Sequence, residues 1–486
     1  MGRVTRGDDI DATAAADGTM ATDGNDAGGA PGSSAAADRR SLWRGFVVAV
    51  VAVLVLTLGV GLLAELVRPG ADPRPAGSAG AAAPSPAPTT SNPSTDALAS
   101  QVQRVLDRRA AALAAGDLAG WLTPLDPAAT EFVGRQREAF AVLRELDVRT
   151  VRWTVARVLA QTAAGLSRVE VAGEWTVPGV DPAPAPFVTV FTVRSASSAP
   201  SSWPSTGSTA TSTTISSTIS STPVLVDDDD PGTTRQAFDL TGAQVVRHGR
   251  AIVLGTAPSD RLEFYARAAD EGLGEVSRVW TPVPTRVLVL APATGAELRT
   301  LSGRVPASGD QVAAVTYGSV AQGRTARGDR VILNPTAWDR LSAAGREIVV
   351  THELTHVSVR ASTTHAPPLW VSEGFATWVA YRAHPVDEGR TAGPAVEHAR
   401  SGEPQQLPAE GAFSSGDVDL AYAQAWTACR YLADRSGPAA LVDLSRRVGA
   451  GESLAAALHA STGLTEQALV TGWSRSLQSS DSSGPP

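Results

Sequence analysis

The segment His352-Glu353-Leu354-Thr355-His356 constrains this 486-residue chain more than any other feature. Two histidines four residues apart lie one turn apart on the same face of an α-helix, so both imidazoles can bind one metal ion. Ser342 is a suitable N-cap residue, and the sequence predicts a helix from there to about Arg360. Glu353 follows the first histidine and can reach a water on the same ion. This pattern indicates a zinc site that lowers the pKa of a water toward ~7, with the glutamate accepting its proton.

A catalytic zinc takes three protein ligands and leaves one position open, so a third ligand is expected. Glu373 is the first candidate, because it lies near the start of the next predicted helix, for which Ser372 is a suitable N-cap. His365 and His384 are the alternatives. The longer zincin motif that uses a third histidine has a glycine-containing turn, and no glycine lies between His356 and His365. Glu373 is therefore the preferred ligand.

The motif and the Trp-Val-Ser-Glu-Gly-Phe-Ala segment that begins at Trp370 resemble the gluzincin metallopeptidases, the superfamily of aminopeptidase N and thermolysin. The closer resemblance is to the peptidase-MA-like domains of bacterial surface proteins. It covers about residues 240–478, within a predicted domain of residues 235–478. The resemblance implies that His352, His356 and Glu373 bind zinc and that Glu353 is the general base. It also implies a mixed sheet, an active-site helix and a C-terminal helical bundle.

The same resemblance implies a role for Tyr422. In aminopeptidase N relatives, a tyrosine that opens a helix downstream of the third ligand stabilises the oxyanion, a task suited to a phenol donor. The Glu-Lys-Gly that follows this tyrosine in those enzymes is replaced here, and a buried core tyrosine is the alternative interpretation. The Gly-x-Met-Glu-Asn motif of aminopeptidases is absent, since Met1 and Met20 are the only methionines. Endopeptidase activity is thus at least as well supported as exopeptidase activity.

The N-terminal part of the chain contains a run without charged residues from Phe46 to Ala64. A helix of ~20 apolar residues crosses a ~30 Å hydrocarbon core, so we expect a transmembrane helix at residues 46–66. Three arginines lie just before the run and two just after it, which favours a cytoplasmic N-terminus. Residues 1–45 then form a disordered cytoplasmic tail. Residues 67–95, rich in Pro, Ala and Ser, form an extended linker to extracytoplasmic domains.

Residues 96–231 predict a separate cone-shaped α+β domain. An amphipathic helix at Asp96–Ala115 and a second helix at about Pro127–Leu146 precede three strand-like segments. This order of elements resembles the nuclear-transport-factor-2-like domains, whose cone often holds a ligand, although a structural spacer is the alternative. A Ser/Thr-rich insert at residues 195–222 is expected to be disordered, and residues 223–226 are expected to return to the same sheet. Residues 479–486 are expected to be a frayed tail.

Composition excludes several classes of function. All 41 basic residues are arginine, which excludes a Schiff-base lysine and a lysine-containing phosphate loop. The net charge of −8 and the lack of a basic block argue against nucleic acid as a partner. Cys429 is the single cysteine, so neither an intrachain disulfide nor a cysteine-rich zinc cluster can form.

Together these patterns predict an α+β chain that one helix anchors in the cell membrane, with a cone-shaped domain followed by a zincin-type domain. The predicted activity is hydrolysis of peptide bonds in a peptide or protein substrate with the help of Zn²⁺. The alternative hypothesis is a catalytically inactive domain that binds zinc or a peptide as part of a cell-surface scaffold.

Overall fold

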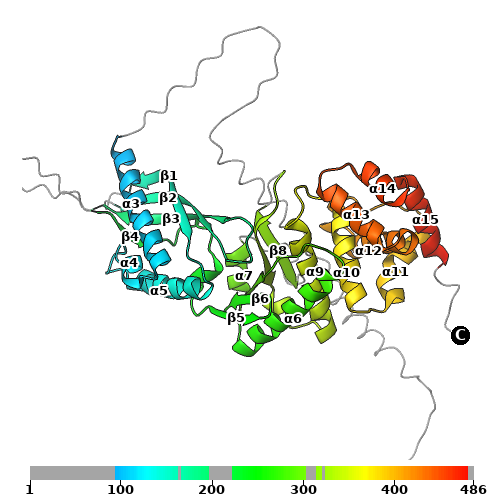
Figure 1. The fold of residues 1–486 in the computed structure, drawn as a ribbon, viewed down its shortest axis with the longest axis horizontal. Coiled ribbons are helices and arrows are strands. Elements are labelled where there is room, and N and C mark those ends of the chain that lie inside the picture. Colours follow the sequence, from blue (N-terminus) through cyan, green and yellow to red (C-terminus); the bar gives the residue numbers. More distant parts are fainter. Residues whose placement is uncertain (1–92, 162–165, 196–221, 303–312, 320–322, 480–486) are drawn as a thin grey trace, which may run out of the picture. The chain divides into compact units, whose positions relative to one another are not determined.

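The computed structural model describes residues 93–161, 166–195, 222–302, 313–319 and 323–479 (Figure 1). In these residues the fold is α+β, with one antiparallel sheet, one mixed sheet and a group of C-terminal helices. The expected α+β class and the C-terminal helical bundle are therefore confirmed. The predicted tail 1–45, nearly all of the linker 67–95, most of the insert 195–222 and residues 480–486 lie outside the described residues.

The expected placement as a single-pass membrane protein needs correction. A bilayer crossing requires about 20 consecutive apolar residues in one helix. Among the residues described above, no helix combines that length with a sufficiently apolar composition. The run predicted to cross the membrane, residues 46–66, lies outside them.

The first folded region is a four-stranded antiparallel sheet in the order β1-β2-β3-β4, with three helices before it. Its elements are α3 (Pro93–Ala115), α4 (Leu118–Leu122), α5 (Thr130–Glu145), β1 (Val151–Gln161), β2 (Leu166–Trp175), β3 (Ala185–Arg194) and β4 (Val224–Asp227). Gln103 of α3 closes the edge of this sheet, because its side chain donates to Trp153 O and accepts from Val155 N, both at 2.8 Å. The predicted return of the chain to the sheet after the insert is confirmed by β4, which pairs with β3.

The second region is a five-stranded sheet in the order β5-β6-β7-β9-β8. Its strands are β5 (Gln244–His248), β6 (Ala251–Gly255), β7 (Val287–Ala291), β8 (Ala314–Ser319) and β9 (Arg327–Leu333). The three central strands are parallel, and the two edge strands β5 and β8 are antiparallel to their neighbours. The helices before, between and after these strands are η2 (Ala237–Asp239), α6 (Ser259–Ser277), α7 (Gly295–Ser302), α8 (Pro335–Trp338) and α9 (Ala343–Arg360).

Both faces of the five-stranded sheet are buried, which explains the unbroken apolar runs of β6 and β7. Alternate residues point to opposite faces, so Val253 and Val289 belong to the core that contains α6 and α9. Ile252 and Leu288 instead share an apolar cluster with residues of the four-stranded sheet, among them Trp175. One continuous cluster therefore includes residues from both sheets.

The C-terminal region is helical, as expected, and is drawn from yellow to red in Figure 1. Its elements are α10 (Leu369–Ala383), α11 (Glu388–Arg400), η3 (Glu410–Phe413), α12 (Val418–Ser436), α13 (Pro438–Gly449), α14 (Leu454–Thr462) and α15 (Glu466–Ser479). The sequence did not predict α11, because Pro394 and two glycines weaken its helical pattern. The predicted N-cap at Ser372 was wrong: α10 begins at Leu369 after Pro368, where the apolar residues that precede Ser372 are already buried in the core.

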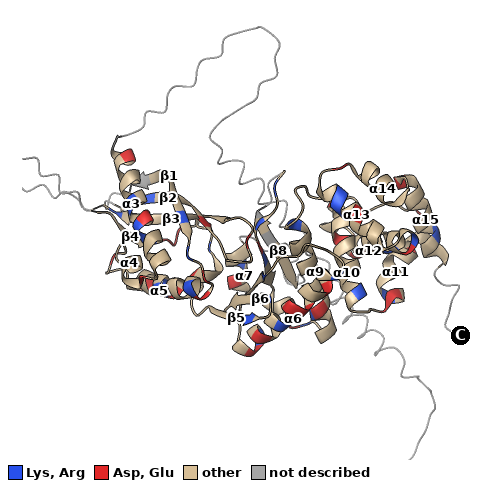
Figure 2. Ribbon diagram, in the orientation of Figure 1, with Lys and Arg blue, Asp and Glu red and all other residues tan. Residues whose placement is uncertain are grey.

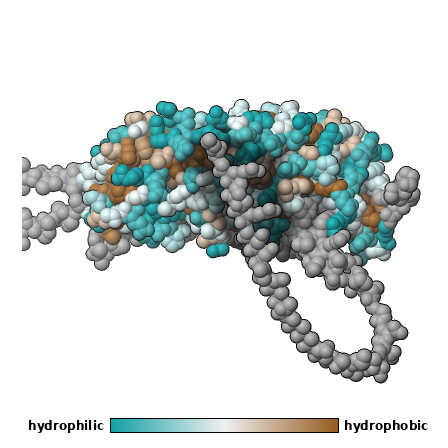
Figure 3. Space-filling model, turned by 90° about the horizontal axis from the view of Figure 1, so that it is seen from below, coloured by the Kyte–Doolittle hydropathy of each residue, from teal (hydrophilic) through white to brown (hydrophobic). Residues whose placement is uncertain are grey.

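Charged residues of both signs are interspersed over the helices and strands (Figure 2). The acidic run Asp227–Asp230 shows how they combine, because its carboxylates form ion pairs with three arginines: Arg135, Arg168 and Arg235. The face of the molecule seen in Figure 3 is mostly hydrophilic, with hydrophobic residues in scattered patches. Most large apolar side chains thus belong to the two buried clusters.

Candidate metal centre

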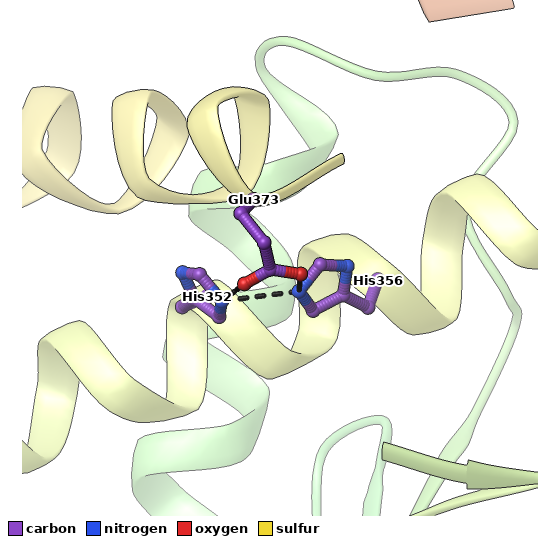
Figure 4. A group of neighbouring side chains, drawn as sticks. All are labelled: His352, His356 and Glu373. Atoms are coloured by element: carbon purple, nitrogen blue, oxygen red, sulfur yellow. Dashed lines mark hydrogen bonds and ion pairs between the residues drawn. The ribbon is translucent and has the colours of Figure 1, made fainter. Parts of the chain in front are cut away.

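Three side chains from two helices converge at one point in the core (Figure 4). His352 and His356 lie on α9, and Glu373 lies on α10. The two Nε2 atoms are 3.0 Å apart. The carboxylate of Glu373 approaches both rings, with Oε2 3.3 Å from Nε2 of His352 and Oε1 3.1 Å from Nε2 of His356. All three side chains are buried.

Local sequence accounts for this arrangement. The Ser342 hydroxyl accepts a hydrogen bond from Gly345 N at 3.1 Å and so begins α9, as predicted. The spacing of four residues then places the two histidines on one face of that helix. Glu373 reaches them because α10 packs tightly against α12 at the next residue, Gly374, which has no side chain to hold the helices apart.

The chemistry of these three groups fits a metal ion. Both oxygens of Glu373 are buried, and neither has a hydrogen-bond partner in the described part of the chain, although both lie close to imidazole nitrogens. The oxygens thus lie close to the nitrogens without making hydrogen bonds to them. Atoms are arranged in this way when their lone pairs point at a common centre. Tetrahedral bonds of about 2.0–2.1 Å would separate ligand atoms by about 3.3 Å, close to the separations seen here. Two imidazole nitrogens and one carboxylate oxygen suit a divalent transition metal.

The electrostatics keep Glu373 ionised. Burial alone would raise the pKa of this carboxyl group, but the imidazoles of His356 and His352 outweigh that cost and lower the pKa to about 2. Because a carboxyl group must lose its proton to bind a metal, Glu373 is in the form that a ligand requires at neutral pH.

Two hydroxyl groups on α10 face the outer nitrogens of the imidazoles. Ser372 Oγ lies 3.4 Å from Nδ1 of His356, and Thr377 Oγ1 lies 3.4 Å from Nδ1 of His352. Groups in this position orient the rings of metal-binding histidines and fix their tautomers. The sequence predicted neither role. Thr377 could have been found, because it lies four residues after Glu373 and hence on the same face of α10.

Glu353 lies beside the three converging groups and is fully buried. Its Oε2 accepts a hydrogen bond of 2.7 Å from Thr316 Oγ1 on β8. Its Oε1 has no partner among the described residues. Burial raises the pKa of Glu353 to about 7, with His352 and the Thr316 hydrogen bond acting in the opposite direction. No local pattern in the sequence points to Thr316, because its position depends on the register of β8.

The two alternative third ligands lie elsewhere. His384 contacts the other side of α9, with Nε2 3.0 Å from Thr351 Oγ1 and Nδ1 3.4 Å from Glu347 Oε2. His365 lies in the loop after α9, where its backbone N–H donates to Gly449 O at 3.0 Å. Neither belongs to the metal-binding group found in the described residues. The structure thus brings Glu373, and neither alternative histidine, together with the two histidines of the motif.

Tyr422 lies in the first turns of α12 and is buried. Its ring packs edge-on against Phe413, with centroids 5.2 Å apart and an interplanar angle of 80°. Tyr422 precedes Ala425 by three residues on α12, so the two share one side of that helix. The carbonyl group of Ala425 faces Gly374 of α10, and Tyr422 therefore lies on the side of α12 that faces α10. A role in catalysis stays a prediction.

Neither the family models nor the curated proteins with which the chain was compared gave a match. The residues of the site and their geometry define a buried group that can hold a metal ion. Beside it lies the carboxylate of Glu353, one oxygen of which has no hydrogen-bond partner among the described residues.

Proposed function

We propose that this protein is a zinc-dependent metallopeptidase of the gluzincin type. The observation that carries the proposal is the convergence of His352, His356 and Glu373 beside Glu353, whose carboxylate has one oxygen without a partner among the residues that the structure describes. The donor set is the His₂Glu combination of catalytic zinc sites, which keep a coordination position open. A closed structural site would need a fourth protein ligand, and neither His365 nor His384 approaches the group.

A zinc ion held by these three residues would polarise a carbonyl group and lower the pKa of a water to about 7. The remaining tasks belong to side chains of the protein. Glu353 Oε1 accepts the proton of the attacking water and then delivers it to the nitrogen of the leaving amine. Thr316 holds Oε2 and so fixes the direction in which Oε1 presents its lone pairs. Burial keeps competing water away from the pair.

The substrate class is a peptide or protein. Tyr422 supports the developing oxyanion in this proposal, as the corresponding tyrosine does in the enzymes that the motif resembles. The sequence lacks the aminopeptidase motif that binds a free amino terminus, so cleavage within a chain is at least as well supported as removal of terminal residues.

The test combines metal analysis with peptide cleavage by the full chain. The parent protein should bind one zinc ion and cleave members of a broad peptide library, and a chelator should abolish the cleavage. Glu353→Gln preserves size and hydrogen bonding to Thr316 but removes the base, which typically costs ~10²–10⁴ in rate. Its zinc content should equal that of the parent.

Glu347→Gln is the matched control. Glu347 lies on the same helix, its side chain is 43% exposed, and its ion-pair partner is His384 rather than a proposed ligand. It should change neither zinc content nor cleavage. A parent protein that holds zinc but cleaves no peptide in the library would support a binding domain without turnover. Equal cleavage rates for Glu353→Gln and the parent would refute the mechanism.

A further inference from the structure

The turn between β2 and β3, residues 176–184, contacts the five-stranded sheet at three places. Gly179 O accepts hydrogen bonds from Arg286 N at 3.0 Å and from Thr285 Oγ1 at 2.7 Å, just before β7. Pro184 O accepts from Arg327 Nε of β9 at 2.9 Å. The third contact joins Asp181 of the turn to Arg330 of β9. These contacts fix the turn to β9 and to the residues just before β7. Both strands lie between the apolar cluster that the two sheets share and the candidate metal centre.

The contact between Asp181 and Arg330 is a buried, two-pronged ion pair. Arg330 Nη1 donates to Oδ1 at 2.6 Å, and Nη2 donates to Oδ2 at 2.8 Å. The exposed fractions of the two side chains are 5% for Arg330 and 1% for Asp181. Asp181 Oδ2 also accepts from Val177 N at 2.7 Å, and the guanidinium lies 5.2 Å from the centroid of Trp175. Burying two charges is costly unless both groups have well-aligned hydrogen bonds, as Asp181 and Arg330 do here. The two-pronged contact therefore holds Arg330 in one position.

Arg330 belongs to the strand pair that supports Glu353 and lies next to Val331, the residue opposite Thr316. In the β8–β9 ladder Arg330 is opposite Tyr317, and its neighbour Val331 is opposite Thr316. Because side chains alternate along a strand, Arg330 faces the turn, while Val331 and Thr316 face α9. The Thr316 hydroxyl, on that second face, donates to Glu353 Oε2.

The other neighbour of Arg330 completes the connection to the active-site helix. Asp329 accepts two hydrogen bonds from Arg360, the last residue of α9, at 2.8 and 3.0 Å. Arg360 also donates to Gly318 O of β8 at 3.1 Å. The β8–β9 pair is therefore held from one side by the turn at residues 176–184 and from the other side by α9.

We infer that Asp181 is a positioning residue for the proposed hydrolysis, and that the four-stranded sheet supports the active site through it. By holding Arg330, Asp181 fixes the β8–β9 pair, and this pair places the Thr316 hydroxyl against Glu353. This inference rests on the proposed function and extends it. It assigns the β2–β3 turn to the active site, although Asp181 touches neither the proposed ligands nor Glu353.

The test uses the full chain with Asp181→Asn, which keeps the shape of the side chain and removes its charge. Displacing a catalytic group by about 1 Å costs up to ~10²-fold in rate, so kcat should fall by about 10–100-fold with KM little changed. Zinc content should equal that of the parent. Hydrogen exchange of the backbone amides of β8 should become faster. A role limited to overall stability would not produce faster exchange in β8 alone.

The matched control is Glu174→Gln. Glu174 forms the neighbouring ion pair of the same region, with Arg327 at 2.9 Å, but both side chains are partly exposed, at 34% for Glu174 and 26% for Arg327. Arg327 is opposite Ser319, at the far end of β8 from Thr316. The control should leave kcat and β8 exchange unchanged. Arg330→Lys keeps the charge but loses the two-pronged contact. It gives a smaller change in the same direction and provides the test if Asp181→Asn does not fold.

Thr316→Val identifies the route, because it removes the hydroxyl that reaches Glu353. If Asp181 acts through Thr316, adding Asp181→Asn to Thr316→Val should lower kcat no more than about twofold further. If the two substitutions lower kcat by fully additive amounts, this route is wrong. The route is also wrong if Asp181→Asn and Arg330→Lys both have the same kcat and the same rate of β8 exchange as the parent. The exchange measurement needs no turnover. If the parent cleaves nothing, the proposed function fails, while faster β8 exchange in Asp181→Asn still supports the connection and unchanged exchange overturns it.

Discussion

Gly374→Ala tests the helix contact that brings Glu373 to the two histidines. A Cβ atom added at Gly374 would lie 2.3 Å from Ala425 O, 2.7 Å from Ala425 C and 2.7 Å from Cys429 Sγ, all on α12. Real Cβ atoms essentially never come within 3.0 Å of such atoms. The nearest obstacle is a backbone carbonyl group, which cannot rotate away as a side chain can. The substitution must therefore push α10 and α12 apart.

The size of the effect follows from two opposing terms. Overpacking a well-packed core typically costs about 1–3 kcal/mol, and contact with rigid backbone places this site at the upper end. Alanine is favoured over glycine in a helix by about 0.8–1.0 kcal/mol, which offsets part of that cost. We expect the free energy of unfolding to fall by about 2 kcal/mol. Because Glu373 precedes Gly374, zinc affinity should also fall, by about 10–100-fold, as for other changes that disturb ligand orientation.

The assay is urea unfolding of the metal-free protein, together with a zinc titration. Gly134→Ala is the matched control: Gly134 lies within α5, and a Cβ atom there would meet nothing within 4 Å. It should stabilise the protein by up to about 1 kcal/mol through helix propensity alone. The reasoning is refuted if Gly374→Ala unfolds at the same urea concentration as the parent and binds zinc equally well. Cys429→Ala should not rescue Gly374→Ala, because the carbonyl of Ala425 remains.

Three further predictions concern the proposed ligands, the oxyanion and the partly buried Asp239. Alanine in place of any of the three proposed ligands should abolish stoichiometric zinc binding, whereas His365→Ala and His384→Ala should retain it, and elemental analysis of each purified variant decides between them. Tyr422→Phe should keep its zinc but lose about 10²–10³ in kcat, the worth of one oxyanion donor, and an unchanged kcat would assign Tyr422 to the core. Burial and the nearby charge of Asp228 raise the pKa of Asp239 to about 7, so its contribution to stability is present below pH 4 and is lost as the pH rises toward 7. Denaturation of Asp239→Asn and the parent should therefore differ in pH dependence over that range, and parallel curves would contradict this assignment.

The sequence determined those features that depend on neighbours in the chain. The spacing of His352 and His356 dictates one helical face whatever surrounds it, because the pitch of an α-helix is a local property. The start of α9 at Ser342 is local for the same reason. Glu373 was identified by its motif, and the structure brings it to the two imidazoles. The start of α10 was missed by four residues, because burial of its first apolar side chains outweighed the capping preference of Ser372.

Tertiary structure decided which distant residues support the site. Thr316 reaches Glu353 only because β8 pairs with β9 in one particular register, and a shift of one residue would turn its hydroxyl to the opposite face. Asp181 meets Arg330 across 149 positions of sequence, through the packing of two sheets. The positions of His365 and His384 away from the metal-binding group were likewise fixed by packing around α9. Spacing along the chain cannot encode such contacts, because they depend on how separately formed sheets and helices bury their apolar faces against one another.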